Sequence, residues 1–191
     1  MATTKEQDIR LIEKVKNGDT QAFRQLVDEY KDLSLSLACS ILKDRAQAED
    51  AIQEAFIKVF RKADSFRQQS AFSSWLFRIV VNTSYNQLKR NRSNLPLTQI
   101  TSNDPAPDEK LALQQLREAD RRKYVIMALD RLKPDEALVL RLFYLCEHSL
   151  KEIAKITGFS TSKIKVDLHR GRKNMGEALK RMLGDQLTDL L

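Results

Sequence analysis

Three of the four prolines in this chain lie in one stretch, and the rest of the sequence holds few residues that break helices. Residues 91–109 contain Pro96, Pro105 and Pro107 and show no sustained helical period. Because proline fixes φ and lacks an amide donor, the stretch predicts an extended linker. The chain is therefore expected to consist of a first domain (1–92), a linker (93–118) and a second domain (119–191).

Apolar residues on both sides of this stretch recur with the period of an α-helix. The clearest run lies between Ala46 and Ala63, where one apolar stripe holds Ala48, Ala51, Ile52, Ala55, Phe56, Val59 and Phe60. Only five glycines serve 191 residues, which disfavours sheets with many tight turns. We expect an all-α fold of two small helical domains. The predicted helices cover 8–16, 20–42, 46–63, 75–90 after a cap at Ser73 or Ser74, 109–132, 135–146, 150–157 and 161–182.

Composition excludes several classes of protein. Hydrophobic residues make up 42% of the chain, enough for a core, and no apolar run has the length of a membrane span. Two cysteines form no disulfide framework and indicate a reducing cytoplasm. The two histidines and two cysteines show no metal-binding spacing, and no phosphate-binding loop is present. We therefore expect no catalytic residue, no cofactor, no metal and no small-molecule substrate.

Positive charge gathers in two places. Residues 61–92 hold 7 basic residues and one acidic residue, and residues 120–191 hold 15 basic and 10 acidic residues. A mildly acidic stretch lies between them. The pattern is typical of a protein that binds a polyanion at two points, although two solvated helix faces would give the same counts.

A helix-turn-helix pattern lies in the second basic region. Ser149 and Glu152 form a capping box, Gly158 ends a short helix, and Ser160 caps the next helix. That second helix has an apolar side and a basic side. The basic side is expected to fit the major groove of DNA, where Arg and Lys contact guanine edges and phosphates. The alternative is an ordinary helical hairpin with a solvated basic face.

The first basic region mixes cations with aromatic and amide side chains. Such a surface suits single-stranded nucleic acid, because rings stack on bases and amides bond to exposed base edges. Alternatively, Phe66 belongs to the core and the amides are solvated. The candidate residues here are Phe66, Arg67, Arg78, Asn82, Tyr85, Asn86 and Lys89.

Asp50, Gln53 and Glu54 share one polar face of the predicted helix over 46–63. They are candidates for docking a basic partner, although their spacing fits a plain solvated face as well.

Two blocks of sequence resemble a bacterial extracytoplasmic-function (ECF) sigma factor of the sigma-70 family. Residues 48–60 with 65–82 are similar to its region 2, and residues 129–134 with 149–173 are similar to its region 4. The blocks stand in the right order around the linker. The competing interpretation is a stand-alone helix-turn-helix regulator, but residues 1–92 show no pattern of a ligand or phosphorylation domain.

The resemblance implies roles for each block. It implies that Asp50, Gln53 and Glu54 dock on core RNA polymerase, and that the residues from Phe66 to Lys89 open the −10 element, with Phe66 and Asn82 holding a flipped base. It also implies that the second helix of the helix-turn-helix binds the −35 element in the major groove. The residues implied in that contact are Ser162, Lys163, Lys165, Val166, His169, Arg170 and Lys173. The implied partners are core RNA polymerase, promoter DNA and an anti-sigma factor, which in its membrane-bound form would keep the cytoplasmic protein near the inner membrane.

Three residues depart from the family pattern. Lys163 stands where Thr is frequent, Asp167 where a basic residue is common, and Gly171 where Ala is usual. Asp167 is expected either to accept from a cytosine amino group or to pair with Lys163 or Arg170. Gly171 is expected to cost about 1 kcal/mol of helix propensity relative to Ala.

Overall fold

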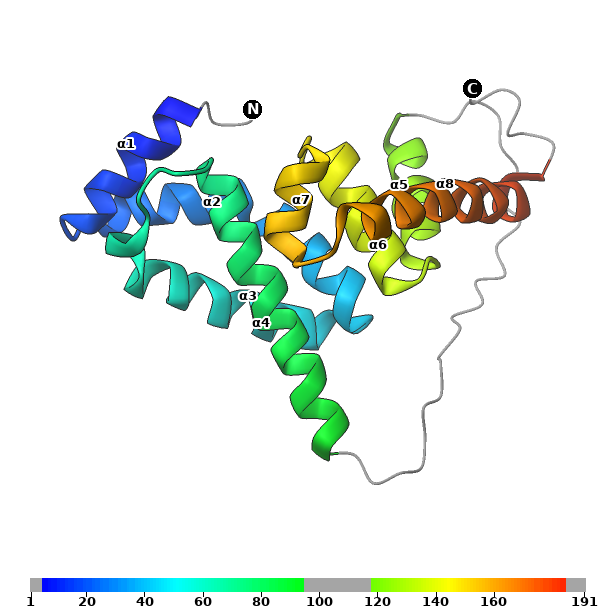
Figure 1. Ribbon diagram of the computed structural model, residues 1–191, viewed down its shortest axis with the longest axis horizontal. Helices are drawn as coiled ribbons and strands as arrows, with labels where there is room; N and C mark the ends of the chain where they lie inside the picture. Colours follow the sequence, from blue (N-terminus) through cyan, green and yellow to red (C-terminus); the bar gives the residue numbers. More distant parts are fainter. Residues whose placement is uncertain (1–4, 95–117, 185–191) are drawn as a thin grey trace.

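The computed structural model describes residues 5–94 and 118–184, and these residues form helices joined by short connections, as the all-α prediction requires (Figure 1). The N-terminal half contains α1 (Lys5–Lys16), α2 (Thr20–Leu42), α3 (Arg45–Arg61), the short η1 (Ala63–Ser65) and α4 (Phe72–Asn94). The C-terminal half contains α5 (Glu118–Asp130), α6 (Pro134–Leu140), the π-helical turn η2 (Arg141–Leu145), α7 (Leu150–Thr157) and α8 (Thr161–Leu183).

Local signals in the sequence set the ends of α2 and α3. The carboxylate of Asp19 accepts hydrogen bonds from the backbone amides of Gln21 and Ala22, and thereby caps α2. Lys43 ends that helix in the left-handed conformation, with φ of 55°. One residue later, Asp44 caps α3 by accepting from the amide of Gln47.

The expected start of α4 is wrong. The helix begins at Phe72, so Ser73 and Ser74 lie inside its first turn rather than at its cap. Phe72 is buried and packs edge-on against Tyr30 and Phe66, which draws the first turn of the helix into the core. The helix also continues to Asn94, past the expected end at Arg90.

Two other expectations concern the C-terminal half. The helix expected over 135–146 divides into α6 and η2, so its last turn is π-helical. The helix expected from residue 109 is described from Glu118 onward, and the predicted linker is outside the described residues apart from its two ends.

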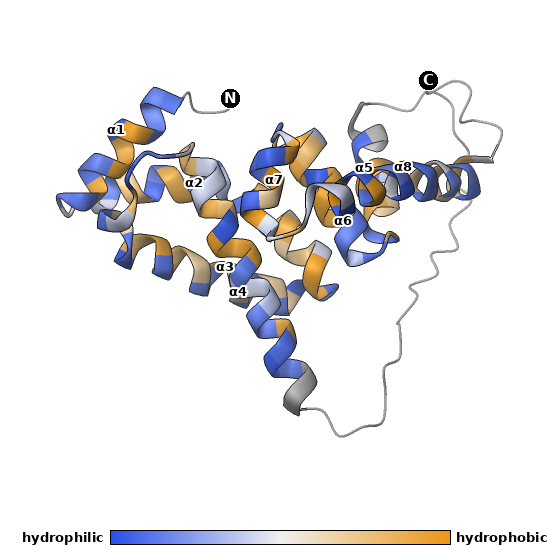
Figure 2. Ribbon diagram, viewed as in Figure 1, coloured by the Kyte–Doolittle hydropathy of each residue, from blue (hydrophilic) through white to orange (hydrophobic). Residues whose placement is uncertain are grey.

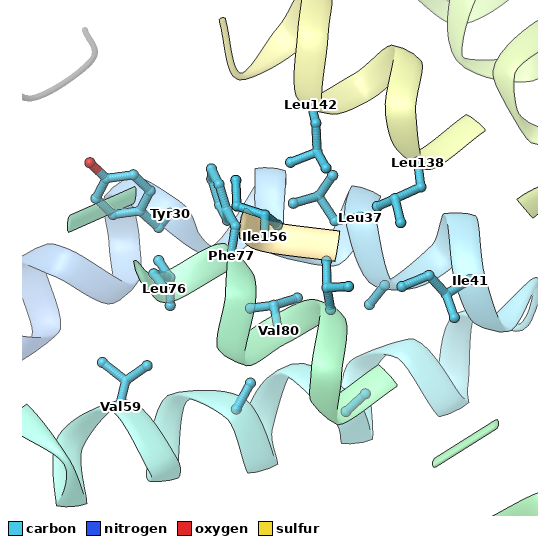
Figure 3. Close-up of a cluster of buried hydrophobic side chains, with 14 of the residues drawn as sticks. Tyr30, Leu37, Ile41, Val59, Leu76, Phe77, Val80, Leu138, Leu142 and Ile156 are labelled. Atoms are coloured by element: carbon cyan, nitrogen blue, oxygen red, sulfur yellow. The ribbon is translucent and has the colours of Figure 1, made fainter. Parts of the chain in front are cut away.

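The two halves of the chain share one continuous core (Figure 3). In the N-terminal half, α2, α3 and α4 pack against one another, and in the C-terminal half α8 packs against α5, α6 and α7. Between the halves, α6 lies against α2 and α7 against α4. Leu138, Leu142 and Ile156 accordingly meet Leu37 and Phe77 in the interior. Hydrophilic and hydrophobic residues alternate along the helices, so that most helices have one side of each kind (Figure 2).

Candidate nucleic-acid interface

The helix-turn-helix predicted from capping signals is present in α7 and α8. Ser149 Oγ accepts from the backbone amide of Glu152 at 3.3 Å, and the Glu152 carboxylate accepts from the Ser149 amide at 2.9 Å. Gly158 ends α7 with φ of 75°, in the left-handed region that glycine enters without strain. Ser160 then caps α8 by accepting from the amide of Lys163.

The two sides of α8 differ as the pattern predicts. Ile164, Leu168 and Gly171 are buried against the rest of the C-terminal half. The opposite side carries a row of exposed side chains that we call the α8 outer face. It consists of Ser162, Lys165, Val166, His169, Arg170 and Lys173. The face combines cations with hydrogen-bonding groups and with an apolar side chain, Val166, that suits contact with a thymine methyl group.

Lys163 does not belong to this outer face. Its ammonium group binds the carboxylates of Asp135 at 2.7 Å and Asp167 at 2.6 Å, and it lies over the ring of Phe159. Burial by itself lowers the pKa of Lys163, but the two carboxylates outweigh that effect and raise the pKa above its usual value. Lys163 therefore fixes the start of α8 in this conformation.

Asp167 is the partner of Lys163, which settles one of the alternatives left open by the sequence. Its side chain is buried and faces Lys163 across one helical turn. A carboxylate in that position is turned away from the α8 outer face. The direct bond from a cytosine amino group is therefore not available in this conformation.

Close packing between α8 and α6 explains why glycine, a poor helix former, occupies position 171. A Cβ atom at this position would lie 2.9 Å from Leu140 Cδ1 and 3.2 Å from Leu140 Cγ, and Leu140 is itself buried. Gly176, five residues later in the same helix, has no heavy atom within 4 Å of its would-be Cβ. The close approach of α8 to α6 therefore depends on glycine at 171.

Most of the candidates in the first basic region lie on the exposed side of α4 or in the loop before it. Exposed side chains here are Arg67, Arg78, Asn82, Asn86 and Lys89. Tyr85 is half-buried, and its hydroxyl donates to the Asp135 carboxylate at 2.9 Å. Burial, with the nearby carboxylate of Asp135, raises the pKa of Tyr85 well above its usual value.

Phe66 is placed in the core, contrary to the expectation that it stacks on a base. Only 3% of its surface is exposed, and its ring contacts Phe72 at 5.8 Å and Trp75 at 5.3 Å between centroids. A ring with so little exposed surface has no room for a base to stack on it. In this conformation Phe66 anchors the loop that carries Arg67, rather than offering a free surface to a base.

The acidic side of α3 is only partly free. Asp50 and Gln53 are exposed, whereas Glu54 accepts from Lys58 at 2.7 Å and from Arg90 at 3.1 Å. The hydrogen bond from Lys58 chiefly lowers the pKa of Glu54. Glu54 thus connects α3 to the end of α4.

Sequence reasoning missed two apolar side chains on α3. Ile57 is 52% exposed, and Phe60, which the apolar stripe placed in the core, is 39% exposed with one edge on Phe23. Ile57 follows Gln53 by four residues, so helical spacing alone places it beside the polar candidates. The α3 docking face, defined here as Asp50, Gln53, Glu54 and Ile57, therefore combines charge with exposed apolar surface.

The part of the chain that the structure describes contains no group of three His, Cys, Asp or Glu side chains arranged to hold a metal ion. Within the same residues, none of the helices has both the length and the hydrophobicity needed to cross a membrane.

Comparison with known proteins identifies both halves. Residues 26–94 match the family model described as Sigma-70 region 2, and residues 122–175 match the one described as Sigma-70, region 4. The ECF RNA polymerase sigma factor SigW of Bacillus subtilis is 31% identical to the chain, over 91% of this chain and 95% of its own length. The RNA polymerase sigma-H factor of Pseudomonas aeruginosa is also 31% identical, with 94% and 97% covered.

A solved structure supports the same assignment. The sigma factor RpoE of Bartonella quintana, crystallised with the anti-sigma factor NepR, superposes with a TM-score of 0.60 and 27% identity. The match covers 83% of this chain and 96% of that one. Two family models in the order of the sigma-70 family, together with relatives matched over nearly their whole length, exclude a stand-alone regulator. The chain belongs to the extracytoplasmic-function sigma factors, the alternative subunits with which RNA polymerase recognises promoters and initiates transcription.

Proposed function

We propose that this sigma factor uses three separate surfaces in transcription initiation. The α8 outer face binds the −35 element, and the exposed side of α4 binds the −10 element. The α3 docking face binds core polymerase. The observation that carries the proposal is the separation of faces on α8. Ile164 and Leu168 fix the helix against its domain, while Arg170 and the other members of the α8 outer face point to solvent.

On α8, the exposed cations are suited to two kinds of contact. Arg170 is a candidate for bidentate recognition of guanine, and Lys165 and Lys173 for contacts to phosphate. Ser162, Val166 and His169 supply the remaining contacts along the groove. Lys163 contributes indirectly, because its two ion pairs set the position of the first turn of the helix.

On α4, exposed amides and cations are suited to a melted −10 strand. Asn82 and Asn86 are the candidates for base edges, and Arg78, Lys89 and Arg67 for the backbone. Phe66 acts as a positioning residue for the loop that carries Arg67, since its ring is held by Phe72 and Trp75.

On α3, Asp50 and Gln53 are the exposed polar contacts to a basic surface of core polymerase, and Ile57 adds apolar area. Glu54 forms ion pairs with Lys58 and Arg90. Its carboxylate therefore orients these two side chains in addition to contacting the partner. The protein acts by binding, without a cofactor and without chemistry of its own.

We also propose a cytoplasmic protein that is controlled by an anti-sigma factor. The support comes from the relative RpoE, which was crystallised with its anti-sigma factor.

Run-off transcription with core polymerase on a library of promoters tests the proposal. Asp50→Lys combined with Gln53→Ala is expected to weaken core binding and transcription while the helical content stays native. Asp32→Lys with Gln25→Ala is the matched control, because both residues are exposed on α2 and the charge change is the same. Equal core binding by the two double variants would remove the α3 docking face from the proposal.

A further inference from the structure

The loop between η1 and α4, residues 66–71, is bonded to α1 at two places. Lys16 Nζ donates to the backbone carbonyl oxygen of Phe66 at 3.1 Å, across 50 residues of sequence. Gln68 Nε2 donates to Glu13 Oε1 at 3.1 Å, across 55 residues. Helix α1 also contacts η1 and α4, the two elements that the loop connects (Figure 1). The loop is therefore held by a helix that is remote from it in the sequence.

Glu13 and Lys16 also bind each other, one helical turn apart. Lys16 Nζ lies 2.8 Å from Glu13 Oε1, the same oxygen that accepts from Gln68. The hydrogen bond from Lys16, followed by the one from Gln68, lowers the pKa of Glu13, which favours the ionised acceptor. An ion pair on an open surface contributes little to stability, but the Lys16 side chain is only 20% exposed. We call Glu13 and Lys16 the α1 brace.

The backbone of the loop needs support at Gln68. This residue has φ of 56°, in the left-handed region that residues other than glycine enter at a cost in free energy. Such a conformation persists only where the surrounding contacts impose it. The bond from Gln68 to Glu13 supplies a contact of this kind at the strained residue itself.

Arg67 lies between the two residues that α1 holds. Phe66 is fixed through its carbonyl oxygen by Lys16 and through its ring by Phe72 and Trp75, whereas the side chain of Arg67 is exposed. The rotamers open to a side chain depend on the φ and ψ of its own backbone. Fixing the chain on both sides of Arg67 therefore restricts the directions in which its guanidinium can point.

We propose that Glu13 and Lys16 are positioning residues for the −10 contact. The α1 brace holds residues 66–71 in one conformation and so presents Arg67 to the melted strand. The proposal rests on the −10 surface proposed above. Helix α1 precedes residues 26–94, which match Sigma-70 region 2, so the brace lies outside the matched region.

The brace has a measurable consequence for DNA affinity. When only a fraction of the molecules has the loop in its binding conformation, the apparent dissociation constant rises by the inverse of that fraction. Loss of the hydrogen bonds made by two charged side chains is expected to lower the fraction about tenfold.

The brace variant combines Glu13→Ala with Lys16→Met, which removes both bonds to the loop and keeps the apolar stem of residue 16. Asp28→Ala with Lys31→Met is the matched control, because these residues form an ion pair at the same i,i+3 spacing on α2 and the net charge again stays unchanged. Lys16→Arg is the rescue variant, since arginine keeps the charge and the donor groups. Circular dichroism verifies native helicity. Where the brace variant loses helicity, Glu13→Ala alone takes its place, because that side chain is 45% exposed.

Nuclear magnetic resonance relaxation measures the loop in the free chain, without DNA or polymerase. Backbone order parameters of residues 67–70 are expected to be about 0.85 in the wild type, the control and Lys16→Arg. In the brace variant they are expected to fall below about 0.6. Equal order parameters in the wild type and the brace variant would overturn the brace, whatever the loop binds.

Holoenzyme assembled with core polymerase measures the consequence for DNA. The probe is a single-stranded oligonucleotide with the −10 sequence that the promoter library selects. The brace variant is expected to bind this probe about tenfold more weakly than the wild type, the control and Lys16→Arg. Binding to a −35 duplex is expected to be equal in all four. A loosened loop with unchanged affinity for the oligonucleotide would refute the positioning role.

Arg67→Ala separates this proposal from the −10 surface on which it rests. Weaker binding of the oligonucleotide by both Arg67→Ala and the brace variant supports both proposals. Weaker binding by Arg67→Ala alone keeps the −10 surface and overturns the role of the brace. Wild-type binding by Arg67→Ala removes the loop from the −10 surface, and the positioning role with it.

Discussion

Arg141 Nε donates to Ser36 Oγ at 2.8 Å although 105 residues separate the two in sequence. The same guanidinium binds Asp130 through Nη2 at 2.7 Å, while its Nη1 has no hydrogen-bond partner among the described residues. A charged side chain is thus buried between α2 and the C-terminal half. Such a group stabilises the structure only as long as its partners stay in place.

Arg141→Ala is expected to lower the free energy of unfolding by about 2–4 kcal/mol, because it removes two charged hydrogen bonds and leaves a cavity. Urea denaturation followed by circular dichroism measures the loss. Arg45→Ala is the control, since that arginine is 76% exposed and pairs with Glu49 at the surface; it is expected to change stability by less than about 0.5 kcal/mol. Equal effects of the two substitutions would mean that the Arg141 contacts add nothing.

Gly171→Ala and Gly176→Ala are expected to change stability in opposite directions. At Gly176 no heavy atom lies within 4 Å of the added methyl group. The substitution is therefore expected to raise the free energy of unfolding by the full difference in helix propensity, about 0.5–1 kcal/mol. At Gly171 the methyl group meets Leu140, and overpacking of about 1–3 kcal/mol outweighs that gain. Thermal unfolding of both variants gives the comparison.

The contact with Leu140 can be isolated by a double-mutant cycle. In a Leu140→Ala background the added methyl group has room, so Gly171→Ala should become neutral or stabilising. A cost at Gly171 that is unchanged in this background would point to a cause other than Leu140.

Phe66→Ala and Asn82→Ala are expected to fail in different ways. Phe66 is buried against Phe72 and Trp75, so its truncation should lower the free energy of unfolding by about 3–5 kcal/mol. Asn82 is exposed, so Asn82→Ala should keep stability within about 0.5 kcal/mol and lose open-complex formation. Urea denaturation and permanganate footprinting on a linear promoter separate the two effects. A fully stable Phe66→Ala variant that cannot melt DNA would restore the base-stacking role.

Arg170→Ala is expected to weaken binding to a −35 duplex by about 1–3 kcal/mol and to relax the preference at one base pair, if the guanidinium reads a guanine. If Arg170 binds phosphate, the loss should be similar across sequences, and the slope of affinity against salt should fall by about one unit. Titration of duplex variants at several salt concentrations decides between these contacts. An unchanged affinity and slope would place Arg170 outside the interface.

His148 is expected to make stability depend on pH below its ordinary pKa of about 6.5. Burial against Phe77 lowers the pKa of His148, an effect that the nearby Glu152 carboxylate only partly offsets. The unfolded chain then binds the proton first as pH falls from 7, so the stability contributed by neutral His148 is present above pH 6.5 and decreases below it, by up to about 1.4 kcal/mol per pH unit. His148→Phe should remove this dependence in denaturation series. Parallel curves for the variant and the wild type would contradict the assignment.

Most of the local structure was predictable because its causes are local. Ser149 and Ser160 each cap a helix by accepting from the backbone amide three residues away, so the signal and its effect lie together in the sequence. The start of α4 was missed because a tertiary cause prevailed. Phe72 packs against Tyr30 and Phe66 in the core. No capping residue in the local sequence indicates that contact.

The same distinction applies to the candidate site. Exposure of Arg170 and Asn82 follows from helical spacing, which the sequence contains. The ion pairs of Lys163 do not, because Asp135 comes from another helix and any lysine on a basic helix looks equally available for DNA. The packing of α2 on α6 could not be predicted from the sequence either. An apolar stripe indicates that a helix face is buried, but it does not identify the helix that covers it.

The position of Lys163 between Asp135 and Asp167 also affects how promoter preference could be exchanged between sigma factors. Grafting the recognition helix of a relative that carries Thr at this position would leave Asp135 without its lysine partner on α8. A neutral side chain would then face a carboxylate whose charge was formerly balanced. Successful chimaeras of this protein would therefore need to transfer residue 135 together with α8, so that the unit of exchange is a helix and one acidic position on its neighbour.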